Sequence, residues 1–173
     1  MNSKILTMLS LSAIIILIIL YGLSSYFVIQ LSRSLPQGLY IKKSVPERIS
    51  TGQMVLFEIP SDIKEVMIKR QWIPSHVRYY LMKPVAAIAG DYIHIDSQGV
   101  FINKIYKGPV QHFDQQGREL PKYHYNGLLE KNTYFVLSPE MNSFDSRYFG
   151  PVQQESIINI VEPFMTFNKE NHE

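Results

Sequence analysis

The chain reads YYLMKPVAAIAG from Tyr79 to Gly90, an apolar run that carries a single charge, on Lys83. An apolar run of this length that closes on a glycine is typical of a buried strand. A lysine in such a strand is either a charged residue that protects a sheet edge or a functional group. Burial lowers the pKa of a lysine, so a buried amine accepts protons near about pH 7–8. The sequence leaves both roles open for Lys83.

Short strands bounded by glycine and proline are predicted on both sides of this run. Residues 91–95 show the alternation of a strand, and after a turn over 96–99 the apolar residues 100–103 return, which predicts a β-hairpin. Further strands are expected at Tyr40–Ile41, Gln53–Ile59, Tyr134–Leu137 and Ser156–Val161. A helix is expected over Ile63–Ile73, with a second short helix over Ser75–Tyr79 as an option. The sequence therefore predicts a mainly β fold with one or two short helices.

The N-terminal part of the chain is apolar enough to cross a membrane. No charged residue occurs from Ile5 to Ser32, and a helix needs only about 20 apolar residues to cross a bilayer. A cleavable signal peptide would have an apolar core of about 7–15 residues and a small-residue cleavage site, and no Ala-x-Ala follows this run. We therefore expect residues 1–32 to be a retained transmembrane anchor and residues 33–173 to form a β-rich peptidase domain.

The composition excludes several classes of function. The chain has 17 Lys and Arg residues against 15 Asp and Glu residues, so it lacks the strong positive charge typical of nucleic-acid-binding proteins. It has no cysteine, which excludes disulfides, a catalytic thiolate and zinc sites built on cysteine. Its five histidines form no HExxH pair or similar ligand spacing. We expect no nucleic-acid partner, no metal and no cofactor.

Two polar segments carry side chains that would complete a site around a buried lysine. Ser34 follows the apolar span and precedes a Pro–Gly turn, so its hydroxyl is expected at the membrane surface, where a tethered substrate presents its cleavage site. Residues 141–150 contain Asp145 and Arg147, which can form an ion pair that holds the loop, and Ser143, which can hydrogen-bond a lysine. The alternatives are a helix-end cap for the serine and an ordinary polar loop with a surface ion pair.

Taken together, these three segments resemble the type I signal peptidases, which are serine proteases with a Ser–Lys pair. The serine box of that family places the nucleophile two residues before a proline, directly after the anchor, as in Ser34–Pro36. Its lysine box reads Lys-x-Val/Ala followed by Gly-Asp, as in Lys83–Asp91. Its last box reads Ser-x-Asp-Ser-Arg-Tyr-x-Gly, as in Ser143–Gly150. The resemblance covers most of the chain and implies a signal-peptidase-like catalytic domain.

The resemblance implies a mechanism that uses no metal or cofactor. Ser34 would attack the scissile carbonyl, and Lys83 would remove the hydroxyl proton and later protonate the leaving amine. The Ser34 N–H would help to stabilise the oxyanion. The resemblance also implies supporting roles. Ser143 would position the lysine, and the ion pair of Asp145 and Arg147 would brace the site. Gly90 would allow close approach of the backbone, and Asp91 would anchor the turn.

The serine box differs from the housekeeping form of the family, which usually reads Ser-Met-x-Pro-Thr. Here it reads Ser-Leu-Pro-Gln-Gly-Leu-Tyr from Ser34 to Tyr40, and with the Val-Ala-Ala stretch after Lys83 it resembles the TraF-type conjugative-transfer peptidases. Those enzymes process a pilin precursor and in some systems join its ends into a ring. The resemblance implies an endopeptidase for an exported precursor, a pilin of a conjugative or type IV secretion system. Two alternatives stay open: a general type I signal peptidase and a catalytically silent scaffold of a secretion apparatus.

The resemblance also implies a single-pass protein of the bacterial inner membrane, with lipid as a partner and its catalytic domain on the periplasmic face. The charge bias points the other way. Lys4 precedes the span, whereas Arg33, Lys42 and Lys43 follow it, and the positive-inside rule would keep the body in the cytoplasm. Long domains are translocated despite such charges. We expect the periplasmic location because exported precursors are cut there.

Overall fold

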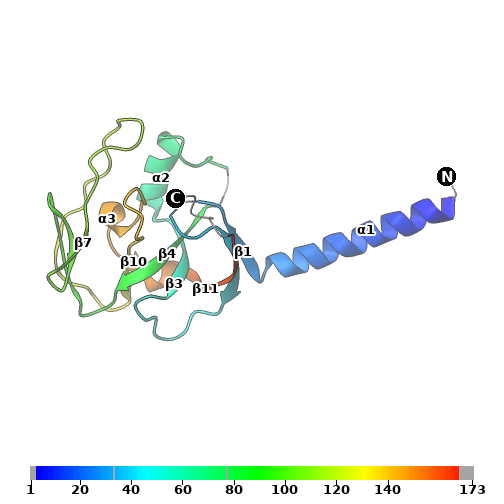
Figure 1. The fold of residues 1–173 in the computed structure, drawn as a ribbon, viewed down its shortest axis with the longest axis horizontal. Coiled ribbons are helices and arrows are strands. Elements are labelled where there is room, and N and C mark those ends of the chain that lie inside the picture. Colours follow the sequence, from blue (N-terminus) through cyan, green and yellow to red (C-terminus); the bar gives the residue numbers. More distant parts are fainter. Residues whose placement is uncertain (1–2, 33, 77, 168–173) are drawn as a thin grey trace, which may run out of the picture.

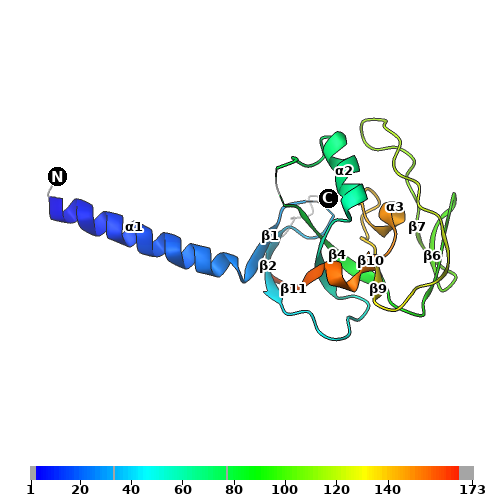
Figure 2. The same ribbon diagram turned by 180° about the vertical axis from the view of Figure 1, so that it is seen from behind.

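The structure is a computed structural model and describes residues 3–32, 34–76 and 78–167. Arg33, Val77 and residues 168–173, which belong to the predicted β-rich domain, lie outside the described part. In the described part, one long helix projects from a β-rich body, and the body contains two sheets and two short helices (Figure 1). The view from behind shows the same separation of helix and body (Figure 2).

All strand pairs between the described residues are antiparallel. The helices are α1 (Ser3–Ser24), α2 (Ser61–Lys69) and α3 (Ser146–Phe149), with a 3-10 turn η1 (Gln154–Ser156). The strands are β1 (Phe27–Gln30), β2 (Gly38–Lys43), β3 (Met54–Glu58), β4 (Tyr80–Ala87), β5 (Tyr92–Asp96), β6 (Gly99–Ile102), β7 (Ile105–Gly108), β8 (Tyr125–Leu128), β9 (Thr133–Val136), β10 (Val152–Gln153) and β11 (Ile157–Thr166). The larger sheet has the order β1-β2-β11-β3-β4-β9-β10, and the smaller has the order β7-β6-β5-β8. The predicted mainly β fold is confirmed.

The lysine run forms β4, inside the larger sheet. On one side β3 pairs with residues Tyr80 to Pro84. On the other side β9 pairs only with Val85 and Ala87. Within the described chain, the backbone from Tyr80 to Lys83 therefore has a strand partner on one side only. This half-open edge lies directly beside the lysine.

Hydrophobic packing joins the two sheets. The predicted hairpin over 91–103 is present as β5 and β6, with Ile93 opposite Ile102. Its buried residues share one core cluster with Ala87 of β4 and Phe135 of β9. Because β4 and β9 belong to the larger sheet, this shared core holds the smaller sheet against it.

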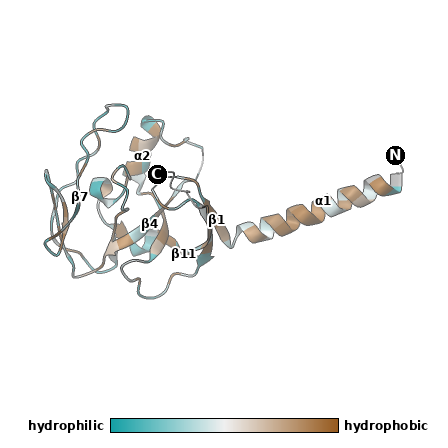
Figure 3. Cartoon of the chain, in the orientation of Figure 1, coloured by the Kyte–Doolittle hydropathy of each residue, from teal (hydrophilic) through white to brown (hydrophobic). Residues whose placement is uncertain are grey.

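The apolar helix α1 is the membrane-span candidate. Thr7–Ser24 is long and apolar enough to cross a bilayer, and Figure 3 shows the hydrophobic colouring along this helix. Its hydroxyl groups bond back to the helix, as Ser10 does to the Thr7 carbonyl (2.8 Å) and Ser12 to the Leu9 carbonyl (2.9 Å), which satisfies them without water. The helix ends well before residue 32, because the β-forming residues of β1 pair with β2 instead.

The described residues of the optional second helix, expected over Ser75–Tyr79, are not helical. The first, expected over 63–73, is α2 and ends earlier, since Gln71 has a positive φ of 60°. Ser75 and His76 lie in a turn, and Arg78 and Tyr79 belong to no helix. Pro74 disfavours the helical conformation of the residue before it and interrupts the segment. The other short helix of the body is instead α3, within the polar segment 141–150.

Candidate active site

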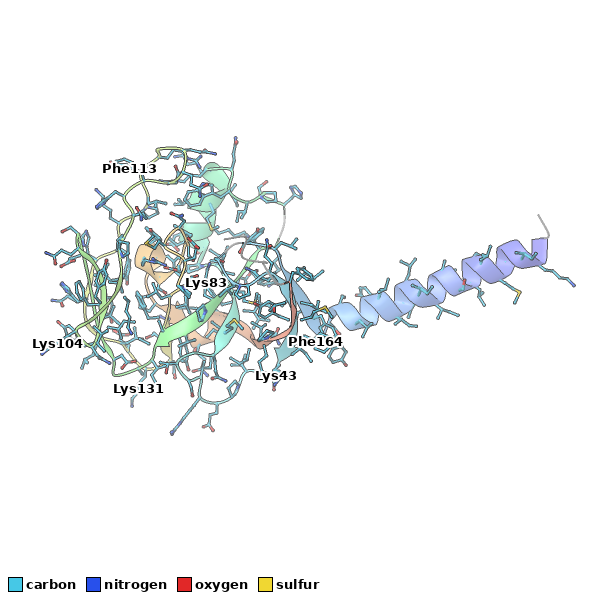
Figure 4. The ribbon with its side chains drawn as sticks, viewed as in Figure 1. Lys43, Lys83, Lys104, Phe113, Lys131 and Phe164 are labelled. Atoms are coloured by element: carbon cyan, nitrogen blue, oxygen red, sulfur yellow. The ribbon has the colours of Figure 1, made fainter. Side chains whose placement is uncertain are left out.

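Lys83 is a buried amine rather than an edge residue. Its side chain is 4% exposed, and Figure 4 shows it inside the body, away from the surface residues Lys43, Lys104 and Lys131. Its Nζ donates a hydrogen bond to the Ser143 hydroxyl at 2.8 Å. A residue that protects a sheet edge would be solvent-exposed, so the burial contradicts that alternative.

The surroundings of Lys83 favour its neutral form. Desolvation by burial lowers the pKa of Lys83 from 10.5 to about 8, while the Asp145 carboxylate opposes this shift and the Arg147 guanidinium adds to it. Among the residues that the structure describes, no carboxylate forms an ion pair with the amine. The site therefore contains a lysine that can act as a base near neutral pH.

Asp145 and Arg147 form the expected ion pair, and both are almost fully buried, at 0% and 2% exposure. Arg147 donates Nη2–H to Oδ2 at 2.8 Å and Nε–H to Oδ1 at 2.9 Å. Desolvation alone would lower the pKa of Arg147, but its hydrogen bonds and charge interaction with Asp145 raise the pKa above the ordinary value. Arg147 also donates to the carbonyls of Ser138 and Glu140, at 2.9 and 3.0 Å. The alternative of a surface ion pair in an ordinary loop is wrong.

Ser138 connects this buried pair to Ser34, and sequence reasoning missed it. Its N–H donates to the Asp145 carboxylate at 3.0 Å, and its hydroxyl donates to the Ser34 carbonyl. The two serines are 104 residues apart in the chain. A serine two residues after a strand carries no pattern that reveals such a partner, so only the fold could have identified it.

The Ser34 hydroxyl contacts the Ser32 hydroxyl, with 2.9 Å between the two Oγ atoms. Ser32 accepts a hydrogen bond from the Gln30 amide at 2.7 Å. The structure describes both Ser34 and Lys83 and shows no hydrogen bond between them. The residues next to them in the sequence do pack together: Leu35, after Ser34, and Met82, before Lys83, belong to one buried cluster.

We call Lys83, Ser143, Asp145 and Arg147 the lysine cluster. Within the described chain, Gly90 and Asp91 make no hydrogen bond to this cluster and belong to the turn that follows β4. Asp91 accepts hydrogen bonds from the Ile88 N–H (2.9 Å) and from the Asn103 amide (2.7 Å), which fixes the turn between β4 and β5. Gly90 has a φ of 93°, a conformation that favours glycine. A Cβ at Gly90 would meet no atom within 4 Å. The expected close backbone approach is therefore not present, and the glycine is explained by the turn.

Loss of the Asp145 carboxylate should destabilise the fold strongly. In Asp145→Ala the buried Arg147 keeps its charge without a counterion, which typically costs about 3–5 kcal/mol. The free energy of unfolding of the full chain in detergent can be measured by urea titration, with emission from the single tryptophan as the signal.

The exposed pair between Lys43 and Glu162 provides the control for this measurement. Its side chains are 51% and 50% exposed, so Glu162→Ala should cost less than about 1 kcal/mol. The double variant Asp145→Ala/Arg147→Met should recover part of the loss, because it leaves no unpaired charge. A loss below about 1 kcal/mol in Asp145→Ala would contradict the structural role of the pair.

Comparison with known proteins identifies the family. The family model described as "Signal peptidase, peptidase S26" matches residues 1–165. This chain belongs to the signal peptidase family S26, a family of serine peptidases. The resemblance inferred from the serine, lysine and Ser143–Gly150 boxes is thereby confirmed.

The relatives with curated names are plasmid transfer and conjugal transfer proteins. A plasmid transfer protein TraF of Escherichia coli is 34% identical over 149 residues, covering 79% of this chain and 81% of that protein. A second Escherichia coli protein of the same name is 31% identical over 146 residues, covering 79% and 80%. A conjugal transfer protein TraF of Agrobacterium fabrum is 23% identical over 156 residues, covering 85% and 86%.

A solved structure also resembles part of the chain. The crystal structure of a signal peptidase I from Enterococcus faecalis has a TM-score of 0.38 and 16% identity, over 66% of this chain and 97% of that chain. This TM-score is too low to establish a shared fold. The family assignment therefore depends on the sequence matches.

Proposed function

We propose that this protein is a membrane-anchored serine endopeptidase in which Ser34 is the nucleophile and Lys83 is the general base. The observation that carries the proposal is the buried amine of Lys83, which is hydrogen-bonded to Ser143 and has a pKa of about 8. Such an amine can accept a serine proton at neutral pH, which an exposed lysine cannot do efficiently. Membership of a serine peptidase family supports the same chemistry.

In the proposed reaction, the Lys83 nitrogen takes the Ser34 hydroxyl proton while Oγ bonds to the scissile carbonyl carbon. The peptide C–N bond then breaks, and the Lys83 ammonium gives the proton to the leaving amine. Water, or an amine of the precursor itself, releases the acyl group from Ser34. The hydroxyl must turn from Ser32 toward Lys83, and catalytic hydrogen bonds often tighten only when substrate is bound.

Neighbouring groups support this reaction. The Ser34 N–H has no hydrogen-bond partner among the described residues and is free to donate to the oxyanion. We assign Ser143 and the Asp145–Arg147 pair to positioning Lys83, through the 2.8 Å hydrogen bond and the electrostatic interactions already described. Ser138 fixes the Ser34 carbonyl and thereby the backbone at the nucleophile.

The half-open edge of β4 is the proposed substrate-binding strand. The backbone from Tyr80 to Lys83 is paired with β3 on one side and is not covered by β9 on the other. An extended peptide can add to such an edge by main-chain hydrogen bonds. A peptide bound there would pass beside the lysine, as cleavage requires.

The proposed substrate is an exported precursor, specifically the pilin precursor of a conjugative transfer system. The names of the relatives, plasmid transfer and conjugal transfer proteins, support this assignment. The test is mass spectrometry of a candidate pilin from cells with and without this protein. A mass loss that depends on the protein supports the proposal, and a further loss of one water would reveal ring closure. Cleavage of many unrelated exports but not of the pilin would favour a general signal peptidase.

The rate of cleavage should follow the ionisation of Lys83. Because its pKa is about 8, kcat/KM should rise about tenfold per pH unit below about pH 8 and level off above it. The free energy of unfolding should rise between pH 8 and 10.5, because the unfolded chain binds the proton in that range and the folded chain does not.

Both pH dependences can be measured on the same preparation, by peptide cleavage and by urea unfolding. In Lys83→Met the contribution of the amine to the pH dependence of unfolding should disappear. A cleavage rate that stays constant from about pH 6 to 9 would contradict the assignment of Lys83 as the base.

We propose that α1 anchors the protein in the bacterial inner membrane and that the sheets with α2 and α3 form the peptidase domain. Exposed apolar side chains surround the point where α1 joins the sheet, and Figure 4 shows Phe164 there. They come from β1, the end of β11 and the adjoining segments: Tyr26, Ile29, Leu31, Phe164, Met165 and Phe167. An apolar surface beside a membrane helix is suited to contact with lipid.

Two of the positive charges after α1, those of Lys42 and Lys43, have partners within the described fold. The Lys42 ammonium donates to the Ser24 carbonyl at 3.1 Å, at the helix end where a positive charge is favourable. Lys43 pairs with Glu162 at 2.5 Å. These contacts give both lysines a role in the fold that is independent of topology.

A reporter fused after Glu173 should locate the peptidase domain in the periplasm. Alkaline phosphatase, which needs the oxidising periplasm, should be active in the fusion, and a fluorescent reporter that matures only in the cytoplasm should stay dark. The opposite pair of results would contradict the proposed topology, because exported precursors would not reach the site.

A further inference from the structure

A cavity of about 380 Å³ lies beside the lysine cluster, within the range of about 300–1,000 Å³ that is typical of ligand pockets. We call it the α2 pocket. Ser143, whose hydroxyl accepts the hydrogen bond from Lys83, forms part of its wall. The other walls come from the end of α2 and the residue Trp72 after it, from residues 111–120, and from Asn142, Phe144 and Tyr148. The pocket and the proposed active site therefore share one residue.

The walls of the α2 pocket are fixed by hydrogen bonds and ring contacts. Residues 112–120 form a hairpin, closed by the Leu120 N–H donating to the His112 carbonyl at 2.8 Å. Arg118 ties this hairpin to the end of α2 by donating to the Arg70 carbonyl at 2.9 Å. Phe144 meets Trp72 edge-on at 5.2 Å between ring centroids. The pocket is therefore preformed by the folded chain.

The lining of the α2 pocket combines four aromatic residues, Trp72, Phe113, Phe144 and Tyr148, with polar side chains, and it carries no net charge. Its charged members, Asp114 and Arg118, pair with each other at 2.7 Å. Its other polar side chains include the amides of Gln111 and Asn142, which make no side-chain hydrogen bond to any residue that the structure describes. Phe113 lies at the surface of the hairpin and is 56% exposed (Figure 4). The two charged lining residues already satisfy each other, and a bulky apolar side chain would find aromatic contacts here.

We propose that the α2 pocket binds a bulky, uncharged side chain of the precursor and thereby sets which peptide bond reaches Lys83. This inference rests on the proposed peptidase function. The shared wall at Ser143 makes a substrate segment the occupant, because Ser143 is hydrogen-bonded to Lys83, which lies on the β4 edge where the peptide is proposed to bind. This preference for a bulky side chain would act in addition to any preference for small residues next to the scissile bond.

The single tryptophan of the chain gives a direct signal for binding, because Trp72 lines this pocket. The probe is a series of peptides that share an Ala-x-Ala segment and carry one para-nitrophenylalanine, a bulky uncharged quencher, at successive positions. Each is titrated against the full chain with Ser34→Ala in detergent micelles. One position should quench the tryptophan saturably, and peptides with the quencher elsewhere should quench weakly.

Phe113→Ala should weaken the apparent affinity of the quenching peptide by about tenfold, through loss of aromatic contact. The control is Tyr106→Ala, which removes an aromatic side chain that is 52% exposed outside the pocket and should leave the titration unchanged. Equal quenching at all positions, or an unchanged titration in Phe113→Ala, would overturn the proposal.

Cleavage assays with the wild-type chain test the pocket separately from the peptidase function. With phenylalanine in place of the quencher, the peptide with the bulky residue at the quenching position should be cut fastest, and glutamate at that position should lower kcat/KM about tenfold. Cleavage without positional preference would refute the pocket and leave the peptidase function intact. Position-specific quenching without Ser34-dependent cleavage would refute the peptidase function and support a peptide-binding pocket.

Discussion

Lys83→Arg is expected to abolish precursor cleavage, with a loss of at least about a thousandfold in kcat/KM. The guanidinium remains protonated at every pH at which the protein is folded, so it cannot take the Ser34 proton. Raising the pH should therefore not restore cleavage in this variant. The measurement is the rate of peptide cleavage by the full chain in detergent, followed by mass spectrometry.

Two controls separate the loss of the base from damage to the fold. Lys83→Met replaces the amine with an apolar side chain of similar length, so it should fold stably and remain inactive. Lys43→Arg makes the same exchange at an exposed lysine, 51% accessible and paired with Glu162, and should retain full activity. If Lys83→Arg kept more than about a tenth of the wild-type rate, Lys83 would not be the general base.

Ser34→Ala is expected to cause a loss of the same order, because it removes the atom that forms the acyl intermediate. The Ser34 carbonyl still accepts the hydrogen bond from Ser138 in this variant, so the fold should be retained. The precursor should accumulate uncut, as seen by mass spectrometry of cells that carry the variant.

The neighbouring serines provide graded controls. Ser32→Ala removes the hydroxyl that contacts the Ser34 hydroxyl and should lower the rate by only about tenfold. Ser44 is exposed, and Ser44→Ala should have no effect. A Ser34→Ala protein that still supports conjugative transfer would favour the alternative of a catalytically silent scaffold.

The parts of the fold that were predictable from sequence are those set by local pattern. The apolar run around Lys83 is β4, and the alternation after Gly90 is the β5–β6 hairpin. The spacing of Asp145 and Arg147 predicts their ion pair correctly. Two residues that are so near each other in the sequence can meet without any tertiary contact. The burial of that pair was not predictable, since it depends on carbonyls of Ser138 and Glu140 that the loop folds around the guanidinium.

The contacts that cross the fold were not predictable. Ser138 has no sequence signal, because its partners are set by the approach of β9 to the segment after β1. Ser32 was placed in the predicted anchor, whereas the helix ends at Ser24 and the sheet begins at Phe27. Apolar composition alone does not separate a membrane helix from a strand that continues directly from it.

That short passage from α1 to β1 has a mechanical consequence. Only Ser25 and Tyr26 separate the helix from the sheet, and the Lys42 backbone N–H holds the Tyr26 carbonyl at 2.7 Å. With α1 in the bilayer, as proposed, no flexible tether would separate the bilayer from the sheet, and the proposed nucleophile Ser34 would be kept at a constant height above the lipid. In a precursor that is itself anchored in the membrane, only a peptide bond at the matching height would reach Ser34. The number of residues between the membrane segment of the precursor and the bond would therefore help to select the bond that is cut.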